Sequence, residues 1–118
     1  MFYPIIRKAI VDRHSLTGIY DDYVRFFSPY MIGKDRNGVP TLVAFQYGGG
    51  RRGTLSGLGE WCCFQVGGLR AVRLNGDKWV TGTARPPVDW ISEIDVSAEA
   101  LTQPEQAYSP SEQLTARR

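Results

Sequence analysis

The chain has 118 residues, enough for one domain with one hydrophobic core and too few for two ordinary domains. Hydrophobic residues at 42% and charged residues at 22% are typical of a globular protein, and no apolar run approaches the roughly 20 residues that a membrane-spanning helix requires. The formal net charge of +2 is the sum of two unlike parts. Residues 1–85 contain 12 Lys and Arg and 6 Asp and Glu, whereas residues 86–118 contain 2 Lys and Arg and 6 Asp and Glu. Such a split indicates an anionic partner for the body, an acidic tail near it, or an ordinarily solvated surface.

The N-terminal sequence predicts one short amphipathic helix. Pro4 fits the first turn of a helix, and apolar residues recur one turn apart until about Arg13. The apolar start is only four to five residues long and no small-residue cleavage site follows it, so we expect no secretory signal and a cytoplasmic protein.

Residues 16–27 predict a β-hairpin with Asp21-Asp22 as a two-residue turn, because aspartate tolerates the unusual backbone angles of such turns. This register pairs Tyr20 with Tyr23, Ile19 with Val24, Gly18 with Arg25, Thr17 with Phe26 and Leu16 with Phe27. We expect the nearly apolar face with Ile19 and Val24 to meet the core. On the other face Arg25 lies between aromatic residues, and Gly18 opposite it leaves room for its side chain.

The rest of the chain predicts further short strands separated by turns. They cover about residues 39–47, 61–66, 69–74 and 78–84, with Asn75-Gly76 as a hairpin turn, and a late edge strand falls within 88–96. Residues 48–59 contain six glycines and predict a mobile loop. We therefore predict a mainly β fold, a small and strongly bent antiparallel barrel preceded by one helix, over residues 1–96. Residues 97–118 predict a polar, acidic tail that is flexible or partly helical.

The sequence offers little for catalysis or metal binding. Cys62 and Cys63 are adjacent in a predicted strand, where their side chains point to opposite faces, so we expect both to be reduced. His14, the one histidine, falls at the expected end of the helix, where a cation is favoured by the helix dipole. With no further ligand candidates we expect no metal, no cofactor and no enzymatic activity.

The order of these features resembles the WYL-domain family. In that family a helix is followed by a strand ending in Tyr, a hairpin bearing Arg, a Pro and a Leu-Gly or Ile-Gly pair, and Tyr20, Arg25, Pro29 and Ile32-Gly33 stand in those places. The naming triplet reads Pro40-Thr41-Leu42 here, and polar positions of a later strand are replaced by Cys62 and Gly67-Gly68. The resemblance implies an SH3-like (Sm-like) small barrel that senses an anionic effector, as in transcription regulators, without a DNA-binding helix-turn-helix of its own.

We predict an anion-binding site formed by Tyr20, Tyr23, Arg25, Arg51 and Arg52, with a nucleotide or single-stranded nucleic acid as the ligand. Two simpler interpretations compete with it. Arg25 would only cover Phe27 and pair with Asp21 or Asp22, and the loop with Arg51 would be an ordinary solvated hairpin loop.

Two further expectations concern aromatic residues. The alternative function is a protein-interaction or oligomerisation module, a homodimer or a complex with a regulatory protein, in which Phe27, Tyr30 and Trp90 form the contact. Trp61, Trp79 and Trp90 are expected to pack in the core or at an edge, and exposure of Trp90 would favour base stacking instead.

Overall fold

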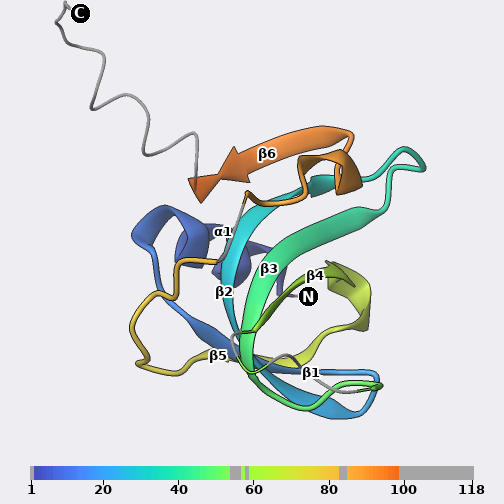
Figure 1. The fold of residues 1–118 in the computed structure, drawn as a ribbon. Helices are drawn as coiled ribbons and strands as arrows, with labels where there is room; N and C mark the ends of the chain where they lie inside the picture. The colour runs from blue at the N-terminus through green and yellow to red at the C-terminus, as the bar shows by residue number, and fades with distance from the viewer. Residues whose placement is uncertain (1, 54–56, 58, 83–84, 99–118) are drawn as a thin grey trace, which may run out of the picture.

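The computed structural model describes residues 2–53, 57, 59–82 and 85–98, which form one antiparallel β-sheet with a helix at its N-terminus (Figure 1). The elements in chain order are α1 (Tyr3–Asp12), β1 (Leu16–Tyr20), β2 (Tyr23–Lys34), β3 (Pro40–Gly49), β4 (Glu60–Gln65), the short 3₁₀ helix η1 (Val66–Gly68), β5 (Arg70–Leu74), the 3₁₀ helix η2 (Val88–Trp90) and β6 (Glu93–Ser97).

The sheet has the strand order β4-β3-β2-β1-β5, and β6 pairs with β2. The 12-residue strand β2 pairs with β1 along its first half, with β6 along its second half, and with β3 on its other side. The predicted mainly β fold with one N-terminal helix is confirmed. In the described residues the two outermost strands of the order, β4 and β5, are not paired with each other, so the sheet is open and no closed barrel is seen.

Helix α1 packs on the sheet as its apolar pattern predicts. Ile6, Ala9 and Ile10 are buried in the main core, and Arg13 ends the helix in the left-handed conformation. In that conformation the amides of Arg13 and His14 donate to the carbonyls of Ile10 and Ala9, which satisfies the last turn. The predicted end of the helix near Arg13 is confirmed.

The predicted register of the first hairpin is confirmed pair by pair, but the assignment of its faces was wrong. Asp21 and Asp22 both have positive φ, 51° and 66°, as a two-residue hairpin turn of this kind requires. Phe27 is fully buried and packs on Phe64 at 5.3 Å between ring centroids, whereas Val24 is 47% exposed. The face that carries Phe27 and Arg25 therefore meets the core, because its larger apolar side chains bury more surface and aromatic rings enclose the arginine.

Gly18 lies opposite Arg25 as predicted, but the space beside Gly18 is filled by side chains from residues 69–72. A Cβ atom on Gly18 would lie 3.3 Å from a methyl carbon of Val72 and 3.6 Å from Leu69. The missing side chain thus admits these two buried residues to the core beside β1. The expectation that Gly18 makes room for Arg25 is corrected accordingly.

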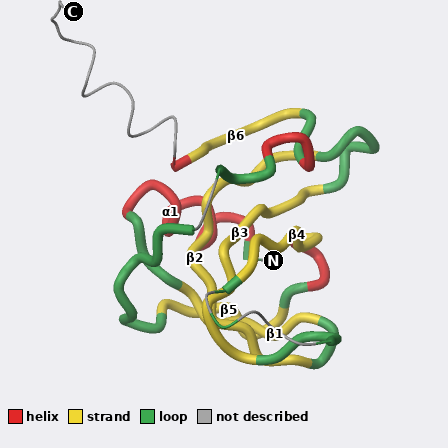
Figure 2. The backbone as a smooth tube through the Cα atoms, in the orientation of Figure 1, coloured by secondary structure: helices red, strands yellow, loops and turns green. Residues whose placement is uncertain are grey.

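The predicted strand over 78–84 is absent from the described residues 75–82, which form an irregular segment beside the sheet (Figure 2). Side chains take the place of a strand ladder. The Tyr30 hydroxyl donates to the Val80 carbonyl at 2.9 Å and accepts from the Gly82 amide at 2.8 Å. The Val80 amide donates to Ser28 Oγ at 2.9 Å. These bonds give the backbone groups of Val80 and Gly82 partners without β-pairing.

At the C-terminal end the predicted late edge strand is confirmed as β6. Ser97 still belongs to this strand and Ala98 is buried. The remainder of the predicted tail, 99–118, lies outside the described residues. In the described part, no helix combines the length and apolar character needed to cross a bilayer.

Candidate functional site

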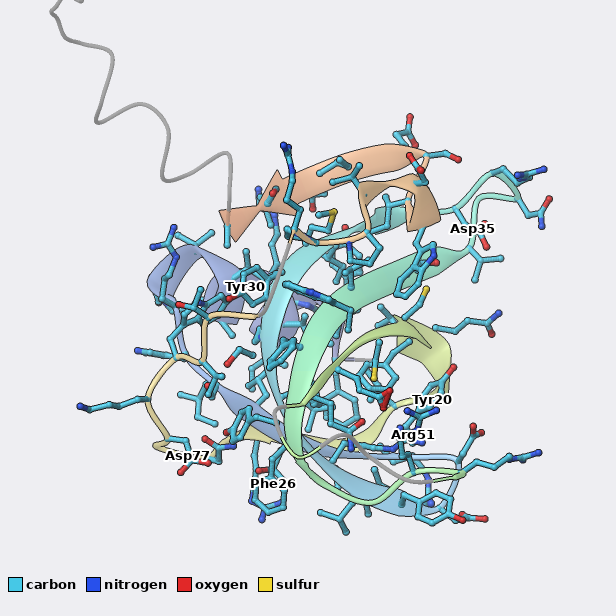
Figure 3. The ribbon with its side chains drawn as sticks, viewed as in Figure 1. Tyr20, Phe26, Tyr30, Asp35, Arg51 and Asp77 are labelled. Carbon is cyan, nitrogen blue, oxygen red and sulfur yellow. The ribbon has the colours of Figure 1, made fainter. Side chains whose placement is uncertain are left out.

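An open cavity of about 380 Å³ lies along strand β4, beside the end of the β1–β2 hairpin. Its volume is in the usual range for small-ligand sites, roughly 300–1,000 Å³. The residues around it come from five parts of the chain: Tyr20, Asp21, Arg25, Arg51, Arg52, Glu60, Trp61, Cys62, Cys63, Phe64 and Trp90. Four of the five predicted ligand-binding residues are therefore brought together, and Figure 3 shows Tyr20 and Arg51 on the same side of the molecule.

Arg25 is the most buried charged group of the cavity, with only 5% of its surface exposed. Its Nε and Nη2 donate to the Tyr20 carbonyl at 3.2 and 3.0 Å, and its Nη1 donates to Gln46 Oε1 at 3.1 Å. Among the described residues Arg25 has no carboxylate partner, so the ion pair with Asp21 or Asp22 that belonged to the competing interpretation is not formed. Asp22 instead pairs with the exposed Arg70 at 3.1 Å.

Aromatic rings enclose the Arg25 guanidinium. Its central carbon lies 5.5–5.6 Å from the ring centroids of Tyr20, Tyr23 and Phe64. Contacts of this kind stabilise a cation that has lost its water. Tyr23, the fifth predicted residue, does not line the cavity but covers Arg25, and a Cβ atom on Gly50 would lie 2.9 Å from its ring.

Gln46 was not singled out by the sequence, and it holds Arg25 in place. Its side chain is fully buried, in the middle of the apolar strand β3. While Oε1 accepts from Arg25, Nε2 donates to the carbonyls of Gly48 and Gly50 at 3.0 and 2.9 Å. The amide thus connects Arg25 to the segment that leads to Arg51. The available signal was an amide side chain at position 46, inside a strand rich in β-branched and aromatic residues.

The two arginines after β3 differ in their surroundings. Arg51 donates through Nη1 to Glu60 in an ion pair, and through Nε to the Arg52 carbonyl at 3.1 Å. Arg52 is exposed at the mouth of the cavity, and no carboxylate in the described residues pairs with it. The predicted mobile loop of residues 48–59 begins inside β3, and residues 54–56 and 58 lie outside the described part.

Tryptophan and tyrosine rings give the cavity an apolar wall. Tyr20 packs on Phe64 at 4.8 Å, and its hydroxyl accepts from the Gln65 amide at 3.1 Å, which fixes the ring. Trp61 contacts the core rings of Phe45 and Tyr30, as predicted for a packing residue. Trp90 is 42% exposed and faces the same cavity, so its ring is available for stacking.

Both cysteines line the cavity as free thiols. Burial raises the pKa of Cys62, an effect that the neighbouring Arg25 and Arg51 oppose. Burial also raises the pKa of Cys63, and Asp35 adds to that rise. Both thiols are therefore protonated at neutral pH, and Cys62 contacts Gln46 Oε1 at 3.6 Å.

The cavity is cationic overall, because three arginines face the two carboxylates of Asp21 and Glu60. In the described residues no three His, Cys, Asp or Glu side chains are placed to hold a metal ion. The arrangement is suited to holding an anion that also carries a flat ring. Comparison with known proteins found no matching family model, no matching curated protein and no matching solved structure.

Proposed function

We propose that this protein is a non-enzymatic binding domain whose cavity takes a nucleotide or a segment of single-stranded nucleic acid. The observation that carries the proposal is the buried Arg25 guanidinium, which lacks a carboxylate partner in the described residues and lines an open cavity with Arg51 and Arg52. A buried cation without a counter-ion is costly, and an anionic ligand would supply the missing charge.

The second component of binding is stacking. Trp90 and Tyr20 border the same cavity as the arginines, so a phosphate at the guanidiniums would place its base near an aromatic ring. Base–aromatic stacking contributes about 1–3 kcal/mol per base and depends little on sequence. We therefore infer binding with little base specificity, in a regulatory or ligand-sensing role.

The proposal includes the fold family. We infer a WYL-like domain related to SH3-like barrels, on the order of Tyr20, Arg25, Pro29 and Ile32-Gly33 along β1 and β2. Strand β2 pairs with β1 along its first half and with β6 along its second half, and this change of partner supports the inference.

Of the aromatic residues expected to form a protein contact, Phe27 is fully buried and Tyr30 is 8% exposed, both within the domain's own core. Trp90 is the exposed one of the three. The oligomerisation alternative therefore has less support than ligand binding.

Fluorescence anisotropy with a labelled single-stranded oligonucleotide across a salt series tests the proposal. Binding at low salt should weaken as salt rises, with a slope of log K against log salt of about −0.7 per phosphate contacted. Arg52→Ala, at an exposed position, should reduce the magnitude of the slope by about 0.7. Arg25→Ala should reduce affinity tenfold or more, because it removes the buried positive charge that the anion would neutralise.

The matched control is Arg36→Ala, which removes an exposed arginine in the turn between β2 and β3, outside the cavity. It should leave both affinity and slope unchanged. Thermal unfolding of each variant checks that it is folded, and Arg25→Lys, which keeps the charge and loses the fork, is the second variant at that position. Absence of binding at low salt, or equal effects of Arg36→Ala and Arg52→Ala, would rule the proposal out.

A further inference from the structure

Glu60 places a carboxylate inside a cavity proposed to bind an anion. It is the first residue of β4 and lies opposite Gln46 of β3 in the sheet register. Its side chain is 31% exposed and forms the ion pair with Arg51, whose side chain is 33% exposed. Arg25, by contrast, donates its hydrogen bonds in the described part of the chain to the neutral oxygens of Tyr20 and Gln46. Before a ligand binds, the Arg51 guanidinium is therefore paired with a carboxylate, whereas in the described residues the Arg25 guanidinium is not.

The Glu60 carboxylate competes with an incoming anion for the Arg51 guanidinium. The anion can bind at Arg25 without displacing a charge, but at Arg51 it must replace Glu60 or lie beside it and tolerate like-charge repulsion. Arg51 also donates Nε to the Arg52 carbonyl, so Glu60 and this carbonyl already occupy two of its five donors. Only a ligand with more charge than a single carboxylate gains by exchanging with Glu60.

We propose that Glu60 is an internal competitor that makes the cavity selective for a phosphomonoester over a phosphodiester. This inference rests on the proposed function and names its ligand class. A phosphomonoester carries a charge of about −1.5 to −2 at neutral pH and three terminal oxygens, enough to engage Arg25 and Arg51 together. A phosphodiester has one charge and two free oxygens, and it gains less at Arg51 than the carboxylate it displaces. The ligand is thus a nucleotide with a terminal phosphate, either free or at the end of a strand.

Two oligonucleotides of one sequence, both labelled at the 3′ end, test the selectivity. One carries a 5′-phosphate and the other a 5′-hydroxyl, and both are titrated at low salt by fluorescence anisotropy. A nucleoside 5′-monophosphate and the 3′,5′-cyclic monophosphate of the same nucleoside, used as competitors, separate a free nucleotide from a strand end.

Wild-type protein should prefer the phosphorylated strand by about fivefold or more, because the 5′-phosphate adds a charge of about −1.5 to −2 near two guanidiniums. Glu60→Gln should raise the affinity for the 5′-hydroxyl strand and reduce the preference to about twofold or less, because the competitor is gone. Glu60→Ala is the second variant, in case the glutamine amide itself bonds to Arg51. Glu93→Gln, on the exposed strand β6, is the matched control and should change neither affinity.

Equal binding of the two strands by wild-type protein, or an unchanged preference in both Glu60 variants, overturns the inference and leaves the proposed function in place. Failure of both strands to bind wild-type protein at low salt overturns the proposed function itself. A preference for the 5′-monophosphate over the cyclic nucleotide, lost in Glu60→Gln, supports the inference for the free nucleotide as well.

Discussion

Arg25 combines two properties that rarely occur together, near-complete burial and the lack of a carboxylate partner in the described part of the chain. Neutral carbonyl oxygens from Tyr20 and Gln46 accept three of its hydrogen bonds, and three rings surround it. These contacts satisfy donors but do not neutralise charge. The guanidinium is therefore held rigid while its charge stays available to a ligand in the cavity.

Gln46 is the residue on which this arrangement depends, so its replacement should be costly. Gln46→Leu removes the acceptor of Arg25 and the donors to the carbonyls of Gly48 and Gly50. We expect the free energy of unfolding, measured by urea denaturation, to fall by about 2–4 kcal/mol, because buried polar groups lose their partners. Gln65→Leu, at an exposed position of β4, is the matched control and should change stability by less than about 0.5 kcal/mol. Similar losses in both variants would contradict this role of Gln46.

At the scale of the elements, Asp95 of β6 ties the helix to the sheet. It accepts hydrogen bonds from the Tyr3 hydroxyl at 2.9 Å and from Arg7 Nε at 3.0 Å, both on α1. The hydrogen bonds from Arg7 and Tyr3 lower the pKa of Asp95 below its ordinary value of 3.8. Burial, with the hydrogen bond to Asp95, raises the pKa of Tyr3 to about 12. The contact therefore favours charged Asp95 and neutral Tyr3.

The pH dependence of this contact follows from the lowered pKa of Asp95. Its stabilisation is fully present above pH 3.8, the unfolded value, and is lost as pH falls through the lower pKa of the folded state. Asp95→Asn should cost at most about 1 kcal/mol at pH 7, as is usual for exposed pairs. Urea denaturation at several pH values should show this difference shrinking only below pH 3.8. Asp89→Asn, at an exposed aspartate of η2, is the matched control at pH 7 and should change stability by less than about 0.5 kcal/mol.

The β1–β2 hairpin and residues 75–82 show what the sequence could and could not predict. Asp21-Asp22 fixes the register of β1 and β2 locally, so the pairs could be derived from the turn alone. Which face is buried depends on the rest of the sheet, and an arginine among tyrosines looks like a surface group until Phe64 is placed against it. Nearest-neighbour patterns do not contain that information.

Residues 75–82 were predicted wrongly for a related reason. Their Asn-Gly turn signal is strong, but their backbone partners are side chains of Ser28 and Tyr30, some 50 residues earlier. The candidate site shows the same limit. Its arginines and Tyr20 were predicted from their residue types, whereas Glu60 and Gln46 gained their roles only through the pairing of β3 with β4.

In the molecule as a whole, the sheet separates two apolar regions. The main core lies between α1 and one face of the sheet, and a second cluster of Met31, Val43 and Ile91 lies apart from it. Trp61 of β4 packs against both. Strands β2 and β3 contribute residues to both clusters, and Figure 1 shows β3 running between β2 and β4.

The difference in burial between Arg25 and Arg52 should separate the rates at which a ligand arrives and leaves. Arg52 is exposed after the end of β3, where its field reaches a ligand in solution. Arg25 lies on a strand paired on both sides, with β1 and β3. In stopped-flow measurements with the oligonucleotide, Arg52→Ala should lower mainly the association rate constant, and Arg25→Lys should raise mainly the dissociation rate constant. Capture and retention of the ligand would thus be assigned to two arginines of one cavity.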